Sequence, residues 1–130
     1  MSNLVQRVID SFGPEDNEQY GFVQYLEIVA LKHPIKFTSI PNSTWTKSIM
    51  VRVRNTLLGL RPGLCDMLIV YPGRWILFIE MKRLKGGVLS PEQKLWIEAL
   101  SSVPNVEALR ANGCIEATAI LDSLLPSSHV

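Results

Sequence analysis

The feature that most constrains the fold is a pair of apolar runs separated by a tight-turn signal. The runs cover residues 66–71 and 74–81, and Pro72-Gly73 joins them. Both runs are rich in Ile, Val, Leu and Phe, and such a pair around a proline–glycine break is typical of a β-hairpin. Because both runs are nearly continuously apolar, we expect the hairpin to be buried on both faces. Other elements must then pack on it.

Those other elements are predicted from helix-start and helix-stop signals. They place helices from Gly13-Pro14 to His33-Pro34, from Ser90-Pro91 onward and over 115–125, and a third strand over 106–110. The pattern between them over 36–60 is irregular, and 47–58 is compatible with a short basic helix. The order helix, hairpin, helix, strand, helix predicts an α/β fold with a small mixed central β-sheet flanked by α-helices.

The helix that begins at Ser90 has a serine at the N-cap and a proline at its first position. Helical spacing predicts that its apolar side consists of Leu95, Trp96, Ala99 and Leu100.

Composition narrows the class of protein. A chain of 130 residues that is 47% hydrophobic can bury the core of one domain over 1–130, which excludes a disordered chain. Cys65 and Cys114 show no CxxC or Cys/His spacing, which argues against a disulfide framework or a zinc site and for a reducing compartment. No apolar run approaches the roughly 20 residues of a membrane span. We therefore expect a soluble, cytoplasmic protein without a membrane partner.

Charge is unevenly distributed along the chain. The net charge is +1, yet residues 32–85 carry ten Lys and Arg against two acids, while the segments on either side are acidic. A basic middle segment suggests a surface that faces a polyanion, and a solvated lysine-rich face is the alternative.

The only two acids of that basic segment lie at the ends of the predicted hairpin. Asp66 begins the first strand and Glu80 lies near the end of the second, so antiparallel pairing brings them side by side, about 5 Å apart. Lys82, two residues further on, falls on the same face as Glu80. Carboxylates suit Mg²⁺ or Mn²⁺, which polarises a phosphodiester, while an ammonium offsets charge in the transition state. The alternative is three ordinary strand-end charges, because a short D…ExK pattern is degenerate.

The sequence around this constellation resembles the VRR-NUC domain, a branch of the PD-(D/E)XK nuclease superfamily. The resemblance lies in Gly59-Leu-Arg-Pro-Gly-Leu-Cys-Asp66, in Leu77-Phe-Ile-Glu80-Met-Lys82, in Gly86-Gly-Val-Leu-Ser-Pro-Glu-Gln93 and in an E-x-x-x-Q pattern from Glu15 to Gln19. It covers a core of about 15–125 and implies a restriction-endonuclease-like PD-(D/E)XK core. Cys65 stands where the superfamily has a proline that binds no metal, and we interpret Cys65 as a small buried hydrophobe.

The resemblance also implies a role for each site residue. Metal ligands would be Asp66, Glu80, the backbone carbonyl of Met81 and, directly or through water, Glu15. Lys82 would be the catalytic lysine. Gln19 would face the site from the first helix, and Gln93 would point into it from the helix after Ser90. A Ser-x-x-Gln pair is also a capping box, which is the alternative role for Gln93.

The remaining cations are candidates for contacts to DNA phosphates, and an ordinary surface charge is the alternative for each of them. The candidates are Lys36, Lys47, Arg52, Arg54, Arg61, Arg74, Arg83 and Lys85, of which Arg83 and Lys85 flank the ExK strand. Asn42 matches a Pro-Asn pair common in the family, and a turn residue would look the same.

The function implied by the resemblance is metal-dependent endonucleolytic hydrolysis of DNA phosphodiester bonds with Mg²⁺ or Mn²⁺. Stand-alone members of the family, often encoded by phages or bacteria, are thought of as homodimers that resolve Holliday junctions, since a two-fold dimer matches a four-way junction. Two alternatives stay open at this point. One is a nuclease for other DNA, such as flaps, duplex or single strands, and the other is a catalytically inactive DNA-binding module.

Overall fold

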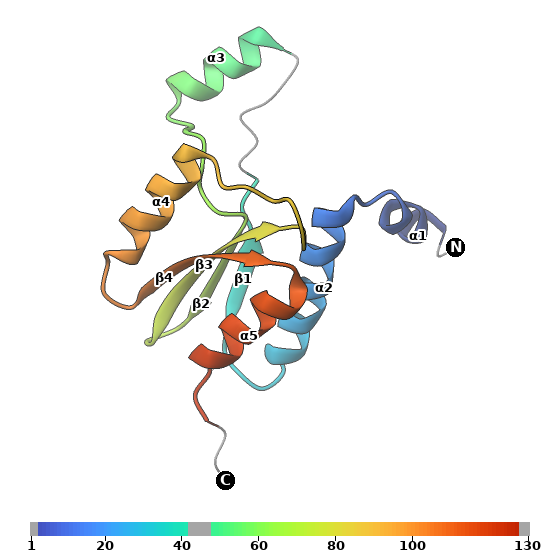
Figure 1. Cartoon of the computed structure of the whole chain (residues 1–130), viewed down its shortest axis with the longest axis vertical. Helices are drawn as coiled ribbons and strands as arrows, with labels where there is room; N and C mark the ends of the chain where they lie inside the picture. Colours follow the sequence, from blue (N-terminus) through green and yellow to red (C-terminus); the bar gives the residue numbers. More distant parts are fainter. Residues whose placement is uncertain (1–2, 42–47, 128–130) are drawn as a thin grey trace. The chain divides into compact units, whose positions relative to one another are not determined.

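The structure, a computed structural model, describes residues 3–41 and 48–127 of the chain (Figure 1). Within these ranges the elements are, in order, α1 (Asn3–Asp10), α2 (Pro14–Val29), β1 (Lys36–Ser39), α3 (Ile49–Leu57), β2 (Met67–Tyr71), β3 (Trp75–Lys82), α4 (Pro91–Ser101), β4 (Val106–Asn112) and α5 (Cys114–Leu124). Of these helices, none is both long enough and apolar enough to cross a membrane.

The predicted hairpin is confirmed. β2 and β3 pair antiparallel around the Pro72-Gly73 turn, in a register that runs from Met67 opposite Ile79 to Tyr71 opposite Trp75. Alternate residues of β2 are fully buried and those between them are half-buried. One face of the hairpin is therefore fully buried, whereas the other is only half-buried, so the expected burial on both faces holds fully for one of them.

The sheet has the order β1-β2-β3-β4 and is mixed, as predicted. β1 pairs antiparallel with β2. Ile76 at the start of β3 donates its backbone N–H to the carbonyl of Asn105, and Gly113, just after β4, donates to the carbonyl of Lys82 at the end of β3. The second residue of β3 thus bonds just before the start of β4, and the last residue of β3 bonds just after the end of β4. β3 and β4 therefore run parallel, and α4 is the crossover helix between them.

The chain divides into two compact units, which are described separately. Unit 1 comprises residues 1–34, 81–87 and 110–130, and unit 2 comprises residues 35–80 and 88–109. A single domain over 1–130 stays a prediction.

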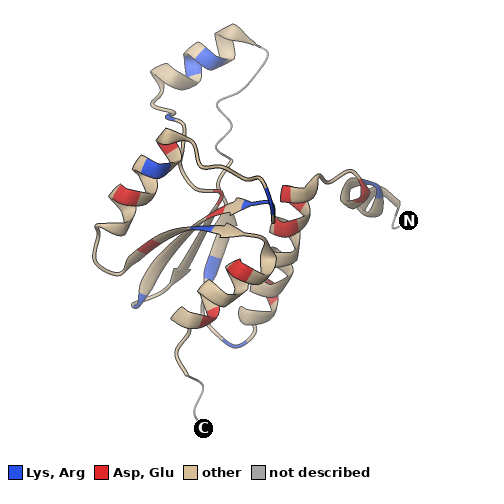
Figure 2. Ribbon diagram, in the orientation of Figure 1, with Lys and Arg blue, Asp and Glu red and all other residues tan. Residues whose placement is uncertain are grey.

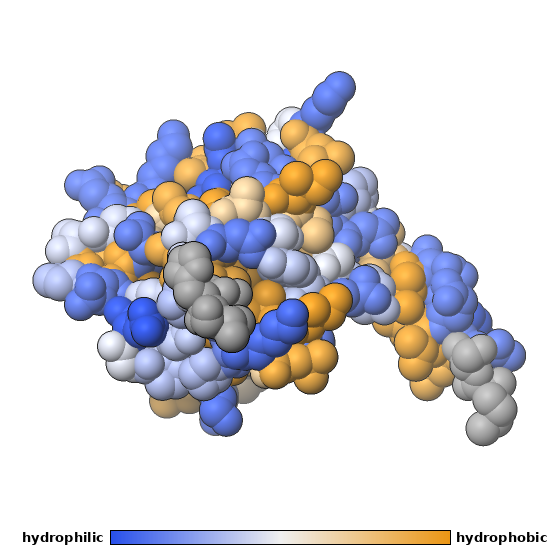
Figure 3. All heavy atoms as spheres, turned by 90° about the horizontal axis from the view of Figure 1, so that it is seen from below, coloured by the Kyte–Doolittle hydropathy of each residue, from blue (hydrophilic) through white to orange (hydrophobic). Residues whose placement is uncertain are grey.

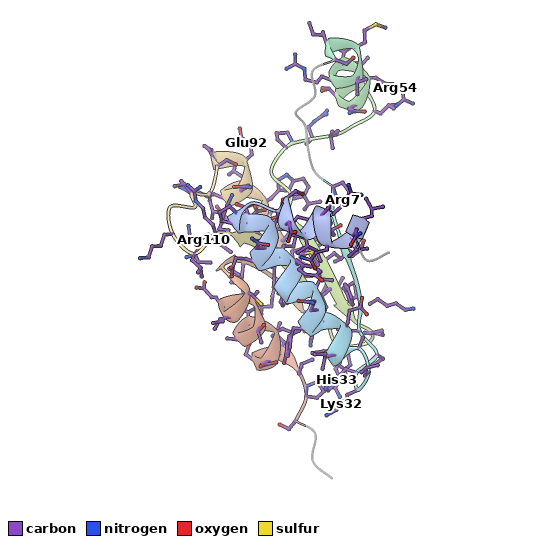
Figure 4. The ribbon with its side chains drawn as sticks, turned by 90° about the vertical axis from the view of Figure 1, so that its right-hand side faces the viewer. Arg7, Lys32, His33, Arg54, Glu92 and Arg110 are labelled. Atoms are coloured by element: carbon purple, nitrogen blue, oxygen red, sulfur yellow. The ribbon has the colours of Figure 1, made fainter. Side chains whose placement is uncertain are left out.

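In unit 1, α2 and α5 lie side by side (Figures 1 and 4). A Cβ at Gly21 would lie 3.2 Å from Cys114 Sγ, so the glycine lets the helices approach closely. Tyr25 also donates its hydroxyl to the Asp122 carboxylate. α1 protrudes and buries none of its residues, and an apolar side is visible on it in Figure 3.

In unit 2, the loop before β2 is fixed against α4. Trp96 donates its indole N–H to the Pro62 carbonyl at 3.0 Å. α3 is also part of this unit and buries no residue. The predicted basic helix is thereby confirmed in position, except that Lys47 lies outside the described residues.

Sequence patterns missed two elements and misplaced one helix face. α1 has no capping signal, and β1 is four residues long with only one apolar side chain, so its pairing with β2 defines it as a strand. In α4, Leu95 is 66% exposed and Ala99 is exposed as well, whereas Gln93, Trp96, Ile97 and Leu100 are half-buried. The side of α4 that faces inward is therefore rotated about the helix axis from the side that was predicted to be apolar. The prediction failed because a polar residue, Gln93, lies on the inward side.

Candidate functional site

The two acids of the basic segment lie together at the open end of the hairpin, as predicted. Met67 pairs with Ile79, so one further step along the same register brings Asp66 opposite Glu80. A carboxylate oxygen of one lies within 4.8 Å of a carboxylate oxygen of the other. Glu80 is 2% exposed and Asp66 is half-buried. Burial of a carboxylate is costly unless it is hydrogen-bonded or binds a cation, which sets this pair apart from exposed strand-end charges.

Gln93 holds the buried carboxylate. Its side-chain amide Nε2 donates to Glu80 Oε2 at 3.0 Å. At the same time its Oε1 accepts from the backbone N–H of Ser90 at 2.9 Å, and its own backbone N–H donates to Ser90 Oγ at 3.1 Å. The capping box is therefore confirmed, and it uses one side of the amide, while the other side points to Glu80. The role of Gln93 in a functional site stays a prediction.

The loop that delivers Asp66 is held from two sides. The Asp66 carbonyl accepts from the backbone N–H of Ile40 at 2.7 Å. Gly63 has a φ of +103°, and a Cβ there would lie 2.6 Å from the carbonyl carbon of Glu92 in the first turn of α4. Sequence reasoning recognised the turn but missed that Gly63 is needed for a close backbone approach. The positive φ and the contact both depend on tertiary packing, which a sequence pattern does not show.

Cys65 is a buried neutral thiol, as interpreted from the sequence. It is 0% exposed. Burial, together with the negative charges of Glu80 and Asp66, raises the pKa of the Cys65 thiol to about 12. The thiol therefore stays protonated near neutral pH, which disfavours a nucleophilic role.

β3 continues past Glu80 into unit 1 with Met81, which is fully buried, and Lys82, which is half-buried. Alternation along the strand puts Lys82 on the same face of β3 as Glu80. A Cβ at Gly87 would lie 2.8 Å from Lys82 Cβ, so the chain turns back closely over the lysine stem. Gly87 is a second residue whose role the sequence did not reveal, since the Gly86-Gly87 pair indicated only a break.

The predicted residues of the first helix lie in unit 1. Glu15 lies in the first turn of α2, and Gln19 is half-buried one turn later. Between them along the chain, Glu18 accepts the backbone N–H of Cys114 at the start of α5, at 2.8 Å. Sequence reasoning missed Glu18, which has no motif beyond its acidic neighbours.

Arg83 and Lys85 line a cleft of about 590 Å³ in unit 1. Its other lining residues are Pro14, Asn17, Glu18 and Leu84. Both cations are exposed, and Arg83 also donates to the Gly86 carbonyl at 3.2 Å. The two best phosphate candidates thus share one recess.

The other candidate cations are dispersed. Arg52 and Arg54 are exposed on α3, and Lys36 is exposed on β1 (Figure 2). Arg61 donates to the carbonyls of Thr56 and Leu60 and so braces its own loop. Arg74 lies over the Tyr71 ring, 5.4 Å from its centroid. Asn42 and Lys47 fall outside the described residues.

The donor set fits a hard divalent cation. Asp66 and Glu80 offer carboxylate oxygens in one place, as Mg²⁺ and Mn²⁺ prefer, and the nearby sulfur of Cys65 is protonated.

The chain thus has an α/β fold with a four-stranded mixed sheet, and an acidic pair lies at one end of its hairpin. A solved structure described as a "VRR_NUC domain protein" is similar to this chain with a TM-score of 0.66 over 88% of this chain and 90% of that chain, at 18% sequence identity. No family model matches the sequence, and no curated protein matches it. The resemblance noted from the sequence is thus confirmed in the fold.

Proposed function

We propose that this protein is a metal-dependent nuclease that hydrolyses DNA phosphodiester bonds. The observation that carries the proposal is the buried Glu80 carboxylate, which lies beside Asp66 and is held by Gln93. This pair occurs on a fold similar to that of a VRR_NUC domain protein, a description that supports a nuclease.

Asp66, Glu80 and the backbone carbonyl of Met81 are the proposed metal ligands, with Glu15 as the supporting acid from α2. A Mg²⁺ or Mn²⁺ ion bound there supplies Lewis acidity to a phosphate oxygen and lowers the pKa of a bound water. Gln93 keeps one oxygen of Glu80 in a fixed direction through its amide hydrogen bond, so that the carboxylate pays little ordering entropy when it binds a cation.

Lys82 is the proposed catalytic lysine. Its ammonium would orient the attacking water or offset the charge that develops on the phosphate oxygens during in-line attack. Its half-buried stem under Gly87 restricts the directions that the ammonium can take.

The DNA backbone is proposed to contact the exposed cations, above all Arg83 and Lys85 in their shared recess. Gln19, Asn42, Lys47, Arg52, Arg54 and Arg61 complete the proposed DNA-binding set. Arg61 is the weakest of them, because its guanidinium already donates to two backbone carbonyls. Each phosphate neutralised steepens the salt dependence of binding.

The proposed substrate is a four-way DNA junction, cut by a homodimer. Resolution of a junction needs two symmetric cuts, and a two-fold dimer provides two sites related by the symmetry of that substrate. A nuclease for flaps, duplex or single strands, and an inactive DNA-binding module, are the alternatives that the test must separate.

The test is cleavage of a labelled four-way junction, beside its linear duplex arms, with Mg²⁺, Mn²⁺ or EDTA. Glu80→Gln removes the buried charge, and Glu98→Gln makes the same change at an exposed position of α4. We expect paired cuts by the wild type and by Glu98→Gln, and none in EDTA or with Glu80→Gln. Circular dichroism confirms that both variants fold.

The other outcomes are equally informative. Equal cutting of the linear arms would support the proposed nuclease activity but reject the four-way junction as its specific substrate. Cleavage that persists in EDTA, or full activity of Glu80→Gln, would reject the metal mechanism. Tight binding of the junction without cleavage under any of these conditions would instead support a catalytically inactive DNA-binding module.

A further inference from the structure

The first turn of α5 is capped by a residue of another helix. Its N-cap residue, Gly113, makes no side-chain hydrogen bond. The backbone N–H of Cys114 instead donates to Glu18 Oε1 of α2, at 2.8 Å. A carboxylate at this place satisfies one of the free N–H groups at the start of a helix and interacts favourably with the helix dipole. Glu18 thus joins the start of α5 to the neighbouring helix α2 (Figure 1).

The residue before Cys114 joins the same turn to the end of β3. The backbone N–H of Gly113 donates to the carbonyl of Lys82 at 2.9 Å. A Cβ at Gly113 would lie 2.4 Å from Leu84 Cδ2 and 2.9 Å from Glu18 Oε1, so this glycine lies close to both segments. Two consecutive backbone N–H groups therefore connect Glu18 with the backbone of Lys82. All of these residues belong to unit 1.

Glu18 itself lies between two residues of the proposed site. It is half-buried on α2, three residues after Glu15 and one residue before Gln19. We propose that Glu18 is a positioning residue, which fixes the end of β3, and with it Lys82, in relation to α2. It acts through the first turn of α5 and does not need to touch DNA or metal. This role rests on the proposed nuclease, in which Lys82 is the catalytic lysine.

The length of the Glu18 side chain matters for this role. Glu18→Asp shortens the side chain by one carbon–carbon bond, about 1.5 Å, which takes the carboxylate out of hydrogen-bond range of the Cys114 N–H. A shift of α2 toward α5 has little room to compensate, since a Cβ at Gly21, three residues further on, would already lie 3.2 Å from Cys114 Sγ. Glu18→Asp therefore keeps the charge and loses the bond.

The alternative is an electrostatic role for the same carboxylate. Glu18 lines the cleft of about 590 Å³ that also holds Arg83 and Lys85, where a negative charge would weaken the binding of a phosphate. Glu18→Gln distinguishes the two roles, because its amide oxygen can still accept from the Cys114 N–H while the charge is removed. A positioning role predicts that Glu18→Gln resembles the wild type and Glu18→Asp does not. An electrostatic role predicts the reverse.

The first experiment measures the connection itself, without DNA or metal. Amide hydrogen exchange at Gly113, followed by NMR, reports the bond between its N–H and the Lys82 carbonyl. We expect exchange at least about tenfold faster in Glu18→Asp, and within about twofold of the wild type in Glu18→Gln. Tyr25→Phe is the matched control, because it removes another side-chain hydrogen bond between α2 and α5, to Asp122, and should leave exchange at Gly113 unchanged.

The second experiment measures the consequence for the reaction. Cleavage of the labelled four-way junction and of its linear arms in Mg²⁺, at increasing DNA concentration, gives kcat and KM. A misplaced catalytic group slows the chemical step and leaves DNA binding intact, so kcat should fall about 10–100-fold in Glu18→Asp with KM within about twofold of the wild type. Glu18→Gln and Tyr25→Phe should keep kcat within about threefold of the wild type.

The two experiments separate this inference from the proposed function. If the wild type cuts no DNA, the proposed function fails, and exchange at Gly113 still accepts or rejects the connection from Glu18 to Lys82. Unchanged exchange or unchanged kcat in Glu18→Asp would overturn the positioning role. It would also be overturned if Glu18→Gln were as impaired as Glu18→Asp, since the hydrogen bond would then not be the deciding interaction. Equal effects of Tyr25→Phe would assign the result to general packing of the two helices instead.

Discussion

Two glycines with nearly the same backbone conformation allow the loop before Asp66 to be tested with a built-in control. Gly63 has a φ of +103° and Gly59 a φ of +105°. A Cβ at Gly63 would lie 2.6 Å from the Glu92 carbonyl carbon, whereas a Cβ at Gly59 would meet nothing within 4 Å. Alanine at either position thus carries the same φ strain, but only Gly63→Ala adds a collision with the backbone of α4.

The magnitudes follow from these two terms. A left-handed conformation costs a residue with a side chain about 1–2 kcal/mol, offset by about 0.4–1 kcal/mol from the stiffer unfolded chain. Gly59→Ala should therefore lose between about 0 and about 1.6 kcal/mol of unfolding free energy. Overpacking adds about 1–3 kcal/mol at Gly63, because backbone atoms of Glu92 cannot rotate away.

Urea denaturation monitored by tryptophan fluorescence measures both losses. We expect Gly63→Ala to lose about 1–3 kcal/mol more than Gly59→Ala. Isothermal titration should also show weaker Mn²⁺ binding by Gly63→Ala alone, since the collision displaces the loop that carries Asp66 from the helix that carries Gln93. Equal losses in stability would refute the close approach of this loop to α4.

Two further predictions concern the buried groups around Glu80. Gln93→Glu keeps an acceptor for the capping box but replaces the amide that donates to Glu80 with a second carboxylate. In urea denaturation it should destabilise the metal-free protein by about 1.5–3 kcal/mol, and Mg²⁺ should restore part of that loss. The same change at the exposed Gln24 should alter the stability little. Because the pKa of Cys65 is raised from 9.0 to about 12, its unfolded thiol ionises first, and its contribution to stability is lost as pH rises above about 9. Cys65→Ala should reduce this alkaline loss, and iodoacetamide at pH 8.5 should label Cys65 only after unfolding, so rapid native labelling would contradict its burial.

The hairpin and its acidic end could be predicted from sequence because they are local. A proline–glycine turn between two apolar runs sets the register by itself, and the register brings Asp66 opposite Glu80. The start of α4 was predictable for the same reason, since Ser90 and Pro91 are local signals.

The remaining features depend on residues distant in sequence. β1 is a strand because β2 offers it a partner, and Gly63 and Gly87 are needed because other segments approach their Cα atoms. The inward face of α4 was misassigned because Gln93 points to a carboxylate, and an apolar pattern cannot register a polar residue on the buried side.

The register of the hairpin also limits how this site can change over evolutionary time. Asp66 and Glu80 stand opposite each other only for the present length of the turn at Pro72-Gly73. One residue inserted there would shift the pairing by a step and turn the carboxylate of Glu80 to the other face of the sheet. The apolar core residues of β3 would be displaced with it. An insertion at this turn would therefore disturb both the folding of the sheet and the chemistry of the site. A substitution at Gly73, whose φ is +75°, would strain the turn but leave the register unchanged.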